Sequence, residues 1–366
     1  MKLSKGSASA FACSSVPAWI LSLAPALLAQ EILQNPERFW RQESDYAGSR
    51  SCEPCHAEIY RRQAASNHAA SLRSWREVPQ LLPRLPFEVI DRSSGANLRL
   101  HTNETGSLEL IATRGSDVAR FTPDWAFGSG AKGITLVGQA GGAFVESRLS
   151  WYASLVGFDF TTGATKYSPV NAAESLGRKL TLQEAGECFG CHTTGYNRQK
   201  QAPTGEEMGI RCERCHGPGL EHGRAAKGGS AAAAKIFHPG KLGAFAQAQM
   251  CGVCHGNPPE DNNLDAINFI ERTPHTARFP SQRLVLSRCF NESPQGLKCT
   301  TCHDPHGNVS ANRAGFDKSC LVCHGAGAAC PVGRVNCASC HMPVERVMQR
   351  SQFTDHWIRV VRARAN

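Results

Sequence analysis

The sequence predicts an α+β protein that is mostly helical and carries a small antiparallel β insert. Residues 85–162 contain no cysteine and alternate apolar with polar side chains between Gly and Asn turns, which is the period of half-buried β-strands. Residues 180–358 instead form short helical pieces interrupted by Gly and Pro, and their apolar side chains are sparse. A recurring cysteine and histidine motif is concentrated in this helical part. We therefore expect a small antiparallel β unit, and a helical part whose core is not built from side chains alone.

Residues 1–29 are expected to be a signal peptide. Lys2 and Lys5 precede an apolar stretch over 16–29, which two prolines interrupt and which is shorter than the ~20 residues of a membrane span. We expect a protein that is periplasmic or otherwise exported, with no transmembrane span in the mature chain; a retained N-terminal anchor is the alternative. Residues 30–84 follow as a segment with a single cysteine motif, and residues 359–366 form a basic, solvated tail.

The motif is CxxCH, the spacing at which haem c is covalently attached. Cysteines three residues apart lie on one side of a helical turn, so both thiols can reach the vinyl groups along one porphyrin edge. The next histidine supplies the proximal nitrogen to iron. Seven motifs predict seven haems c, and in chain order they are Cys52, Cys55 and His56; Cys188, Cys191 and His192; Cys212, Cys215 and His216; Cys251, Cys254 and His255; Cys299, Cys302 and His303; Cys320, Cys323 and His324; Cys337, Cys340 and His341.

Zinc bound by CxxC pairs is the alternative reading of these cysteines. Zinc does not require a histidine directly after each pair, whereas all seven pairs have one. The haems must then form much of the core of residues 180–358, where six of the motifs lie. This predicts a haem-packed multihaem cytochrome c scaffold that does not fold without haem, as small metal-dependent domains do not.

Four further histidines are expected to bind a second axial position of a neighbouring haem. His68 follows His56 by 12 residues in a good helix-forming stretch, about 18 Å along the axis, and so cannot return to its own iron. His306 comes too soon after His303 to cross its own ring. The turn at 217–219 (Gly-Pro-Gly) directs His222 away from the third motif. The fourth candidate is His356, in FTDHW.

The other histidines and the methionines are weaker candidates for the remaining axial positions. His101 is out of phase with the apolar residues of its predicted strand, so we expect it at the surface. His238 and His275 lie in loops, and their role stays open. Met208, Met250 and Met342 are alternatives, although methionine more often fills gaps in a core.

Composition limits the partners of the protein. Without Lys2 and Lys5 the formal charge falls from +9 to +7. Because each haem adds two propionates, seven ferric haems bring the charge to about zero and seven ferrous haems to about −7. The basic balance therefore does not indicate nucleic-acid binding, and the sequence shows no nucleic-acid motif. Outside the motifs, Cys289 and Cys330 could pair as a disulfide or stay as thiols, and Cys13 lies in the signal segment.

Several segments resemble the multihaem cytochromes c related to hydroxylamine oxidoreductase and to the tetrahaem cytochrome of ammonia oxidisers. These are SCEPCHAEIY with SNHAAS, CERCHGPGLEH, CTTCHDPH, CASCHMP and FTDHWI, which fall within residues 50–75 and 185–358. The resemblance implies haems in parallel and perpendicular pairs along a mostly helical scaffold. It also implies that His68, His222 and His356 are distal ligands. Two signatures of that group are absent from the sequence, a CxxCK site and a tyrosine late in the chain, since Tyr196 is the last tyrosine.

An electron carrier is the favoured function, because no catalytic residue is needed and the signatures of the related enzymes are missing. Its expected partners are a redox protein or a quinol-oxidising membrane donor, and an electron acceptor. A haem enzyme that acts on a small nitrogen or sulfur compound at a five-coordinate haem is the alternative. A filament-forming cytochrome is a third, weaker possibility.

Overall fold

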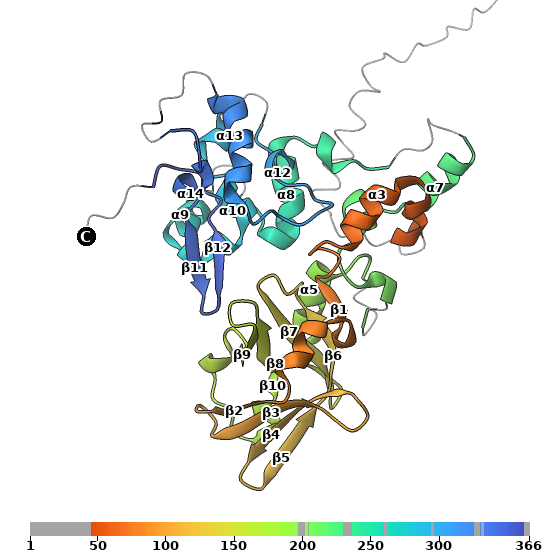
Figure 1. Cartoon of the computed structure of the whole chain (residues 1–366), viewed down its shortest axis with the longest axis vertical. Coiled ribbons are helices and arrows are strands. Elements are labelled where there is room, and N and C mark those ends of the chain that lie inside the picture. Colours follow the sequence, from red (N-terminus) through yellow and green to blue (C-terminus); the bar gives the residue numbers. More distant parts are fainter. Residues whose placement is uncertain are drawn as a thin grey trace, which may run out of the picture.

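The computed structural model describes residues 45–196, 202–203, 205–229, 236–259, 263–293, 296–325, 330 and 333–361 (Figure 1). The predicted signal peptide 1–29, Cys13 and residues 362–366 of the basic tail lie outside these ranges. Within the described residues, every helix is too short or too polar to span a bilayer. Helix accounts for 40% and strand for 23% of the described residues, which therefore form an α+β mixture with antiparallel sheets. A mostly helical fold stays a prediction.

Two antiparallel sheets form the β unit, at the bottom of Figure 1. One sheet pairs four strands in chain order: β2 (Phe87–Asp91), β3 (Ala96–Thr102), β4 (Leu108–Arg114) and β5 (Asp117–Phe121). The other has the order β1 (Leu72–Ser74), β6 (Pro123–Phe127), β7 (Gly133–Ala140), β8 (Ala143–Tyr152) and β10 (Gly177–Leu180), with β9 (Gly157–Phe160) paired to β8. The second sheet thus takes in β1 and β10, which lie outside the range 85–162.

Alternation of side chains explains the core between the sheets. Leu98 and Leu100 of β3 face Ala112 and Leu110 of β4 across the register, and all four are fully buried. Together with Leu149 of β8 they belong to one apolar cluster of nineteen buried residues. The polar residues between them point outwards, as the period of two requires. The β unit therefore has a side-chain core that does not depend on a cofactor.

A buried ion pair joins the two sheets. Asp91 ends β2 and Arg148 lies in β8; their side chains are 3% and 0% exposed, and Arg148 Nη2 lies 2.7 Å from Asp91 Oδ2. Burial by itself raises the pKa of Asp91, but hydrogen bonds from Ser93 and Ser94 and the charge of Arg148 lower this pKa overall. The ionised carboxylate is therefore the form that the fold stabilises.

Replacing Asp91 by asparagine is expected to destabilise the β unit by about 3–5 kcal/mol, because Arg148 then keeps a buried charge without its partner. Because the pKa of Asp91 is lower in the folded than in the unfolded protein, Asp91 stabilises the fold at pH values above its unfolded pKa of about 4. This stabilisation is lost as the pH falls through the pKa that Asp91 has in the folded protein. Hydrogen exchange of β8 amides between about pH 3 and 6 measures both effects. The variant should lose less protection on acidification than the native protein; equal acid sensitivity would contradict this assignment.

The remaining helices are short, and most of them carry a motif. The described helices are α3 (Glu53–Ala64), α4 (Ala172–Ser175), α5 (Leu182–His192), α6 (Cys212–His216), α7 (Leu220–Lys227), α8 (Ala244–His255), α9 (Leu264–Arg272), α10 (Pro280–Leu284), α11 (Arg288–Asn291), α12 (Cys299–Cys302), α13 (Asp317–His324) and α14 (Cys337–His341). A hairpin of β11 (Val344–Met348) and β12 (Ser351–Thr354) follows. Gly217 and Gly256 end α6 and α8 with a positive φ, so each helix stops directly after its motif histidine.

Side chains provide little core in the C-terminal half. Its apolar cluster has three buried residues, Ala248, Leu284 and Phe290. Val322, inside the sixth motif, and Val335, near the seventh, are 79% and 72% exposed. This pattern fits a scaffold whose apolar surface is covered by haem. Of the two possibilities for Cys289 and Cys330, a disulfide or separate thiols, this structure has free thiols at both residues.

Candidate haem sites

All seven motifs lie on or beside a helical turn. Cys52 caps α3, which holds the rest of the first motif; α5, α6, α8, α13 and α14 end on the histidine of theirs, and α12 stops one residue before His303. Their cysteines carry free thiols. In the haem-loaded protein these sulfurs would be thioethers, so their contacts report only which motifs are neighbours. The spacing therefore places both sulfurs and the histidine of each motif at one end of one helix.

Four motif histidines face a histidine from a distant part of the chain. The ring centres of His56 and His222 are 6.4 Å apart with the planes at 19°. The remaining pairs are His255 with His68 at 6.0 Å and 58°, His216 with His306 at 6.1 Å and 10°, and His303 with His356 at 6.1 Å and 45°. Each pair joins one histidine of a motif to one outside the motifs. The structure thus brings each of the four predicted distal candidates beside a motif other than the one that it follows in the sequence. His356, for example, follows the seventh motif and faces the fifth.

These separations fit an iron between the two rings. A metal–imidazole bond is about 2 Å and a ring centre lies about 1 Å behind its nitrogen, so two opposed imidazoles on one metal have centres about 6 Å apart. Direct ring packing spans a range of separations that changes with the interplanar angle. Here the angle varies from 10° to 58° while the separation stays within 6.0–6.4 Å. These four separations therefore leave the space that a shared metal needs.

Hydrogen bonds set the tautomer of several rings. Nδ1 of His216 lies 2.9 Å from the carbonyl of Phe237, and Nδ1 of His356 lies 3.0 Å from that of Thr354. A carbonyl only accepts, so Nδ1 carries the proton and Nε2 keeps its lone pair for a metal. Nδ1 also donates to a backbone carbonyl in His192, to Ser71 at 2.8 Å, and in His341, to Arg359 at 3.0 Å. In His306, Nδ1 donates to the Asp304 carboxylate at 3.3 Å.

The position of the ring proton distinguishes two candidate partners of His216, the histidine of the third motif. His238 also lies near His216, at 6.3 Å and 89°. However, the Gly240 amide donates to Nδ1 of His238 at 3.1 Å, so its proton is on Nε2 and that nitrogen has no free lone pair. His306 has the ligand tautomer and is therefore the better partner of His216. His101 uses both ring nitrogens, with Glu109 at 3.2 Å and Thr102 at 3.0 Å.

Burial keeps two of the paired rings neutral. Burial, together with the charges of nearby histidines, lowers the pKa of His255 to about 4 and that of His356 to about 4. The neutral imidazole is the form that binds a metal. These rings are therefore ready to act as ligands at neutral pH.

The histidines of the second, sixth and seventh motifs have no second histidine ring against them within the described residues. The ring of His192 packs edge-on against Phe127, with centres 5.2 Å apart, which leaves no room for a porphyrin between them. His275 is exposed and does not face a motif histidine in the part of the chain that the structure describes. The sixth ligands of these three sites stay open.

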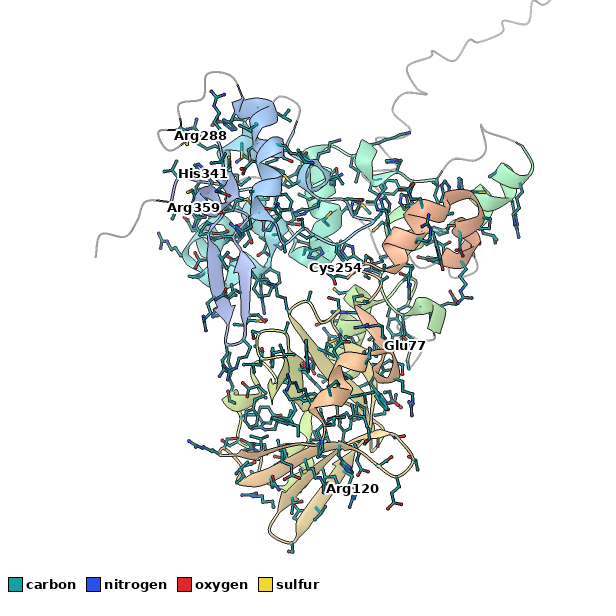
Figure 2. The ribbon with its side chains drawn as sticks, viewed as in Figure 1. Glu77, Arg120, Cys254, Arg288, His341 and Arg359 are labelled. Carbon is teal, nitrogen blue, oxygen red and sulfur yellow. The ribbon has the colours of Figure 1, made fainter. Side chains whose placement is uncertain are left out.

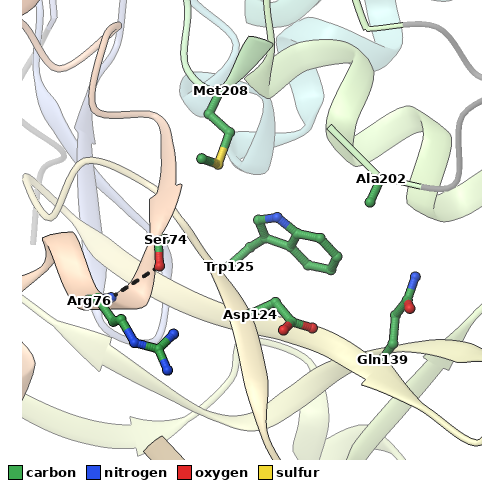
Figure 3. Close-up of a pocket in the computed structure, with 7 residues that line it drawn as sticks. All are labelled: Ser74, Arg76, Asp124, Trp125, Gln139, Ala202 and Met208. Atoms are coloured by element: carbon green, nitrogen blue, oxygen red, sulfur yellow. Dashed lines mark hydrogen bonds between the residues drawn. The ribbon is translucent and has the colours of Figure 1, made fainter. Parts of the chain in front are cut away.

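A cavity of about 430 Å³ lies over β1, β6 and β7 (Figure 3). Ser74, Asp124, Trp125, Gln139 and Met208 line it, with Arg76 and Ala202. Trp125 and Met208 also pack in the apolar cluster that contacts Cys188. Burial raises the pKa of Asp124. No motif in the sequence indicates this cavity, because its walls come from residues spread over more than a hundred positions.

The motifs form one connected network, which branches at the fourth motif. Thiol contacts join the first motif to the third (Cys52 with Cys212), the second to the fourth (Cys191 with Cys254), the fourth to the fifth (Cys251 with Cys299) and the sixth to the seventh (Cys320 with Cys337). Weaker charge interactions link the third to the fourth and the fifth to the sixth. Figure 2 shows Cys254 where the β unit, the N-terminal segment and the C-terminal helices approach one another, and His341 at the outer side. The fourth motif is the junction.

A buried carboxylate orients the segment that carries His356. Asp355 is fully buried; its two oxygens accept from Arg283 at 2.8 and 2.6 Å, and Arg359 donates at 2.7 Å. Trp357 donates its amide to the same carboxylate at 3.0 Å. No pattern in the sequence indicates this network, since Arg283 is 72 residues away from Asp355. Asp355 therefore fixes the backbone on both sides of the fifth site's second histidine.

Replacing Asp355 by asparagine is expected to destabilise the fold by about 3–5 kcal/mol, because the buried Arg283 loses a bidentate partner. The orientation of His356 should change with it. Thermal unfolding measures the first effect and the low-spin EPR signal of the fifth site the second. Glu292→Gln serves as the control, since Glu292 pairs with Arg288 on the surface. Equal stability of the two variants would contradict the role given to Asp355.

Three comparisons relate the chain to known proteins. Residues 157–217, which contain the second and third motifs, match the family model described as "Cytochrome c554 and c-prime". The multiheme cytochrome MtrA of Shewanella baltica (strain OS185) is 27% identical over 201 residues, an alignment that covers 43% of this chain and 60% of that protein. The crystal structure of the outer cell wall cytochrome OcwA superposes with a TM-score of 0.52 at 16% identity, covering 87% of this chain and 80% of that one.

The chain is thus similar to multihaem c-type cytochromes in a motif-bearing segment, in a relative's sequence and in fold. The narrower resemblance to the hydroxylamine oxidoreductase group stays a prediction.

Proposed function

We propose that this chain is an exported heptahaem cytochrome c that passes electrons between redox partners through closely packed, mostly bis-histidine haems. The four opposed histidine pairs at 6.0–6.4 Å carry the proposal. When bound, haem c supplies the reversible one-electron chemistry of iron, and two axial histidines favour a low potential relative to histidine with methionine. The similarity to MtrA and OcwA supports an electron-transfer cytochrome, and no catalytic residue is required.

The protein's own residues position the ligands. Carbonyls of Ser71, Phe237, Thr354 and Arg359 hold Nδ1 protons, so that Nε2 faces the metal position. The contacts between motifs keep the sites in one connected network, in which the fourth motif is the branch point. A chain of close sites held on short, rigid helices suits transfer of electrons and needs no large movement.

The place of action and the partners follow from similarity and composition. OcwA is named as an outer cell wall cytochrome, which supports an exported location for this chain. The partners would be a redox protein or a quinol-oxidising membrane donor on one side and an electron acceptor on the other. The near-zero charge of the oxidised haem-loaded protein gives no reason to expect nucleic acid.

The test combines haem counting with electron exchange. Intact mass should exceed that of the polypeptide by seven haems, and protein reduced by a low-potential donor should be reoxidised by a soluble acceptor such as a ferric chelate. Replacing both Cys337 and Cys340 by serine should remove one haem and leave the others. A haem count well below seven, or a reduced protein that transfers no electrons, would overturn the proposal.

A second candidate function rests on the second motif. His192 has no second histidine beside it among the described residues, and a cavity of about 430 Å³ lies next to the cluster around Cys188. A small nitrogen or sulfur compound could bind at such a site, as a haem enzyme requires. Nitrite and hydroxylamine are the probes. Turnover with a low-potential donor favours the enzyme, and its absence with both compounds favours the carrier.

A further inference from the structure

The third motif carries opposite charges at its two variable positions. Glu213 and Arg214 lie between Cys212 and Cys215 on α6. Glu213 is only 2% exposed, and Arg214 is half-buried. Adjacent residues of a helix point about 100° apart, so the two charges face different neighbours. A buried charge needs hydrogen-bonding or charged partners, and the identity of these partners shows which motifs each side chain contacts.

Glu213 faces the first motif. Its Oε1 accepts from the amides of Ala47 at 2.7 Å and Gly219 at 2.8 Å, and its Oε2 accepts from Gly48 at 3.0 Å. Ala47 and Gly48 lead directly into the first motif. The carboxylate also lies within Coulomb range of the thiols of Cys52 and Cys212. The negative charge therefore sits between the first and third sites, satisfied by amides rather than neutralised by a cation.

Arg214 faces the second and fourth motifs. Its Nη2 donates to the carbonyl of Gly190, inside the second motif, at 2.7 Å. The guanidinium lies within Coulomb range of the sulfurs of Cys191, Cys215 and Cys254. The positive charge is therefore held where the second, third and fourth sites meet.

We propose that the charges of Glu213 and Arg214 set the order of reduction potentials around the third motif. The reduction potential is then lower at the first site than at the second and fourth sites. Electrons therefore pass from the first site through the third towards the fourth. A nearby negative charge stabilises the oxidised, more positive form of a redox group, and a positive charge stabilises the reduced form. Salt screens these two charges less than it screens surface charges, because they are buried or half-buried. Each transfer is a one-electron exchange in which one site is oxidised and the next reduced.

This inference rests on the proposed function, since it requires haem at these sites. The experiment is an EPR-monitored redox titration of the full-length, haem-loaded protein. The first and third sites have nearly parallel rings, at 19° and 10°, whereas the fourth has rings at 58°, so their low-spin signals differ. Arg214→Met should lower the midpoint of the tilted-ring signal. Glu213→Gln should raise the midpoint of the parallel-ring signals.

Two further comparisons separate charge from position. Arg214→Lys keeps the charge but alters the bond to Gly190, so its tilted-ring midpoint should stay at the native value. Glu109→Gln and Arg120→Met break an ion pair in the β unit, away from the motifs, and should shift neither midpoint. If Glu213→Gln does not accumulate with haem, the two Arg214 variants decide.

Opposite shifts in the two charge-removing variants support the inference. Equal shifts in Arg214→Met and Arg214→Lys, shifts in the same direction for Glu213→Gln and Arg214→Met, or no shift would overturn it and leave the electron-carrier function standing. A native protein that shows no haem redox transitions would overturn the proposed function itself.

Discussion

Replacing His68 by alanine is expected to convert one low-spin ferric haem to high spin and leave the others unchanged. The ring of His68 stands 6.0 Å from that of His255, and it reaches the fourth site from the loop after α3. Its backbone carbonyl accepts from Ile210 at 2.9 Å and Ser71 at 3.1 Å, so the loop stays in place without the side chain. The loss should therefore be confined to one axial ligand.

EPR of the oxidised variant measures the change. His101→Ala is the matched control, because His101 is a partly buried histidine in the β unit whose two nitrogens are occupied by Glu109 and Thr102. Its spectrum should equal that of the native protein. His68→Met should keep the fourth site low-spin and raise its potential, since histidine–methionine ligation favours higher potentials. An unchanged spectrum in His68→Ala would rule out His68 as the ligand.

Protein made without haem is expected to lose the C-terminal half of its fold but to keep the β unit. The β unit has nineteen buried residues in one apolar cluster, whereas the C-terminal half has a cluster of three. Ordering that half without haem would lose conformational entropy, and the free-energy cost of this loss is far larger than the burial of three side chains can offset. The sequence alone predicted that the whole chain stays unfolded; the structure narrows this to the haem-bearing helices.

Limited proteolysis of haem-free protein, read by mass spectrometry, tests this. A resistant fragment should begin near β1 and end near β10, and sites after residue 236 should be cut first. Replacing both Cys251 and Cys254 by serine in the haem-loaded protein should expose more of the helical half than the same change at Cys337 and Cys340, because the fourth motif is the junction. Protection of the C-terminal half without haem would contradict the haem-packed core.

Local patterns explain what the sequence could predict. A motif of five residues is sufficient to identify each haem site, and the alternation around Leu98 and Leu100 is sufficient to identify β3. A distal role for His68 could be predicted because the helix-forming stretch after His56 carries it away from its own iron, although α3 ends at Ala64 and His68 lies in the loop that follows. Each of these inferences depends only on neighbours in the sequence.

Long-range contacts account for what was missed. β1 and β10 are three and four residues long and exist because Leu72 pairs with Phe127 and Gly177 with Ser147. The burial of Glu213 depends on amides about 165 residues away. The choice between His306 and His238 rests on a single amide, that of Gly240, which sets the tautomer. No periodicity or motif in the sequence reports such contacts.

The most direct test of the central claim is the EPR spectrum of the fully oxidised protein, with haem content fixed by a pyridine haemochrome assay. The seven motifs predict seven haems per chain. The four opposed histidine pairs predict that at least four of these haems are low-spin and indifferent to added nitrite. Fewer than four low-spin haems in a protein that carries all seven would contradict bis-histidine ligation at these sites. The account of this chain as an electron carrier would then lose its main support.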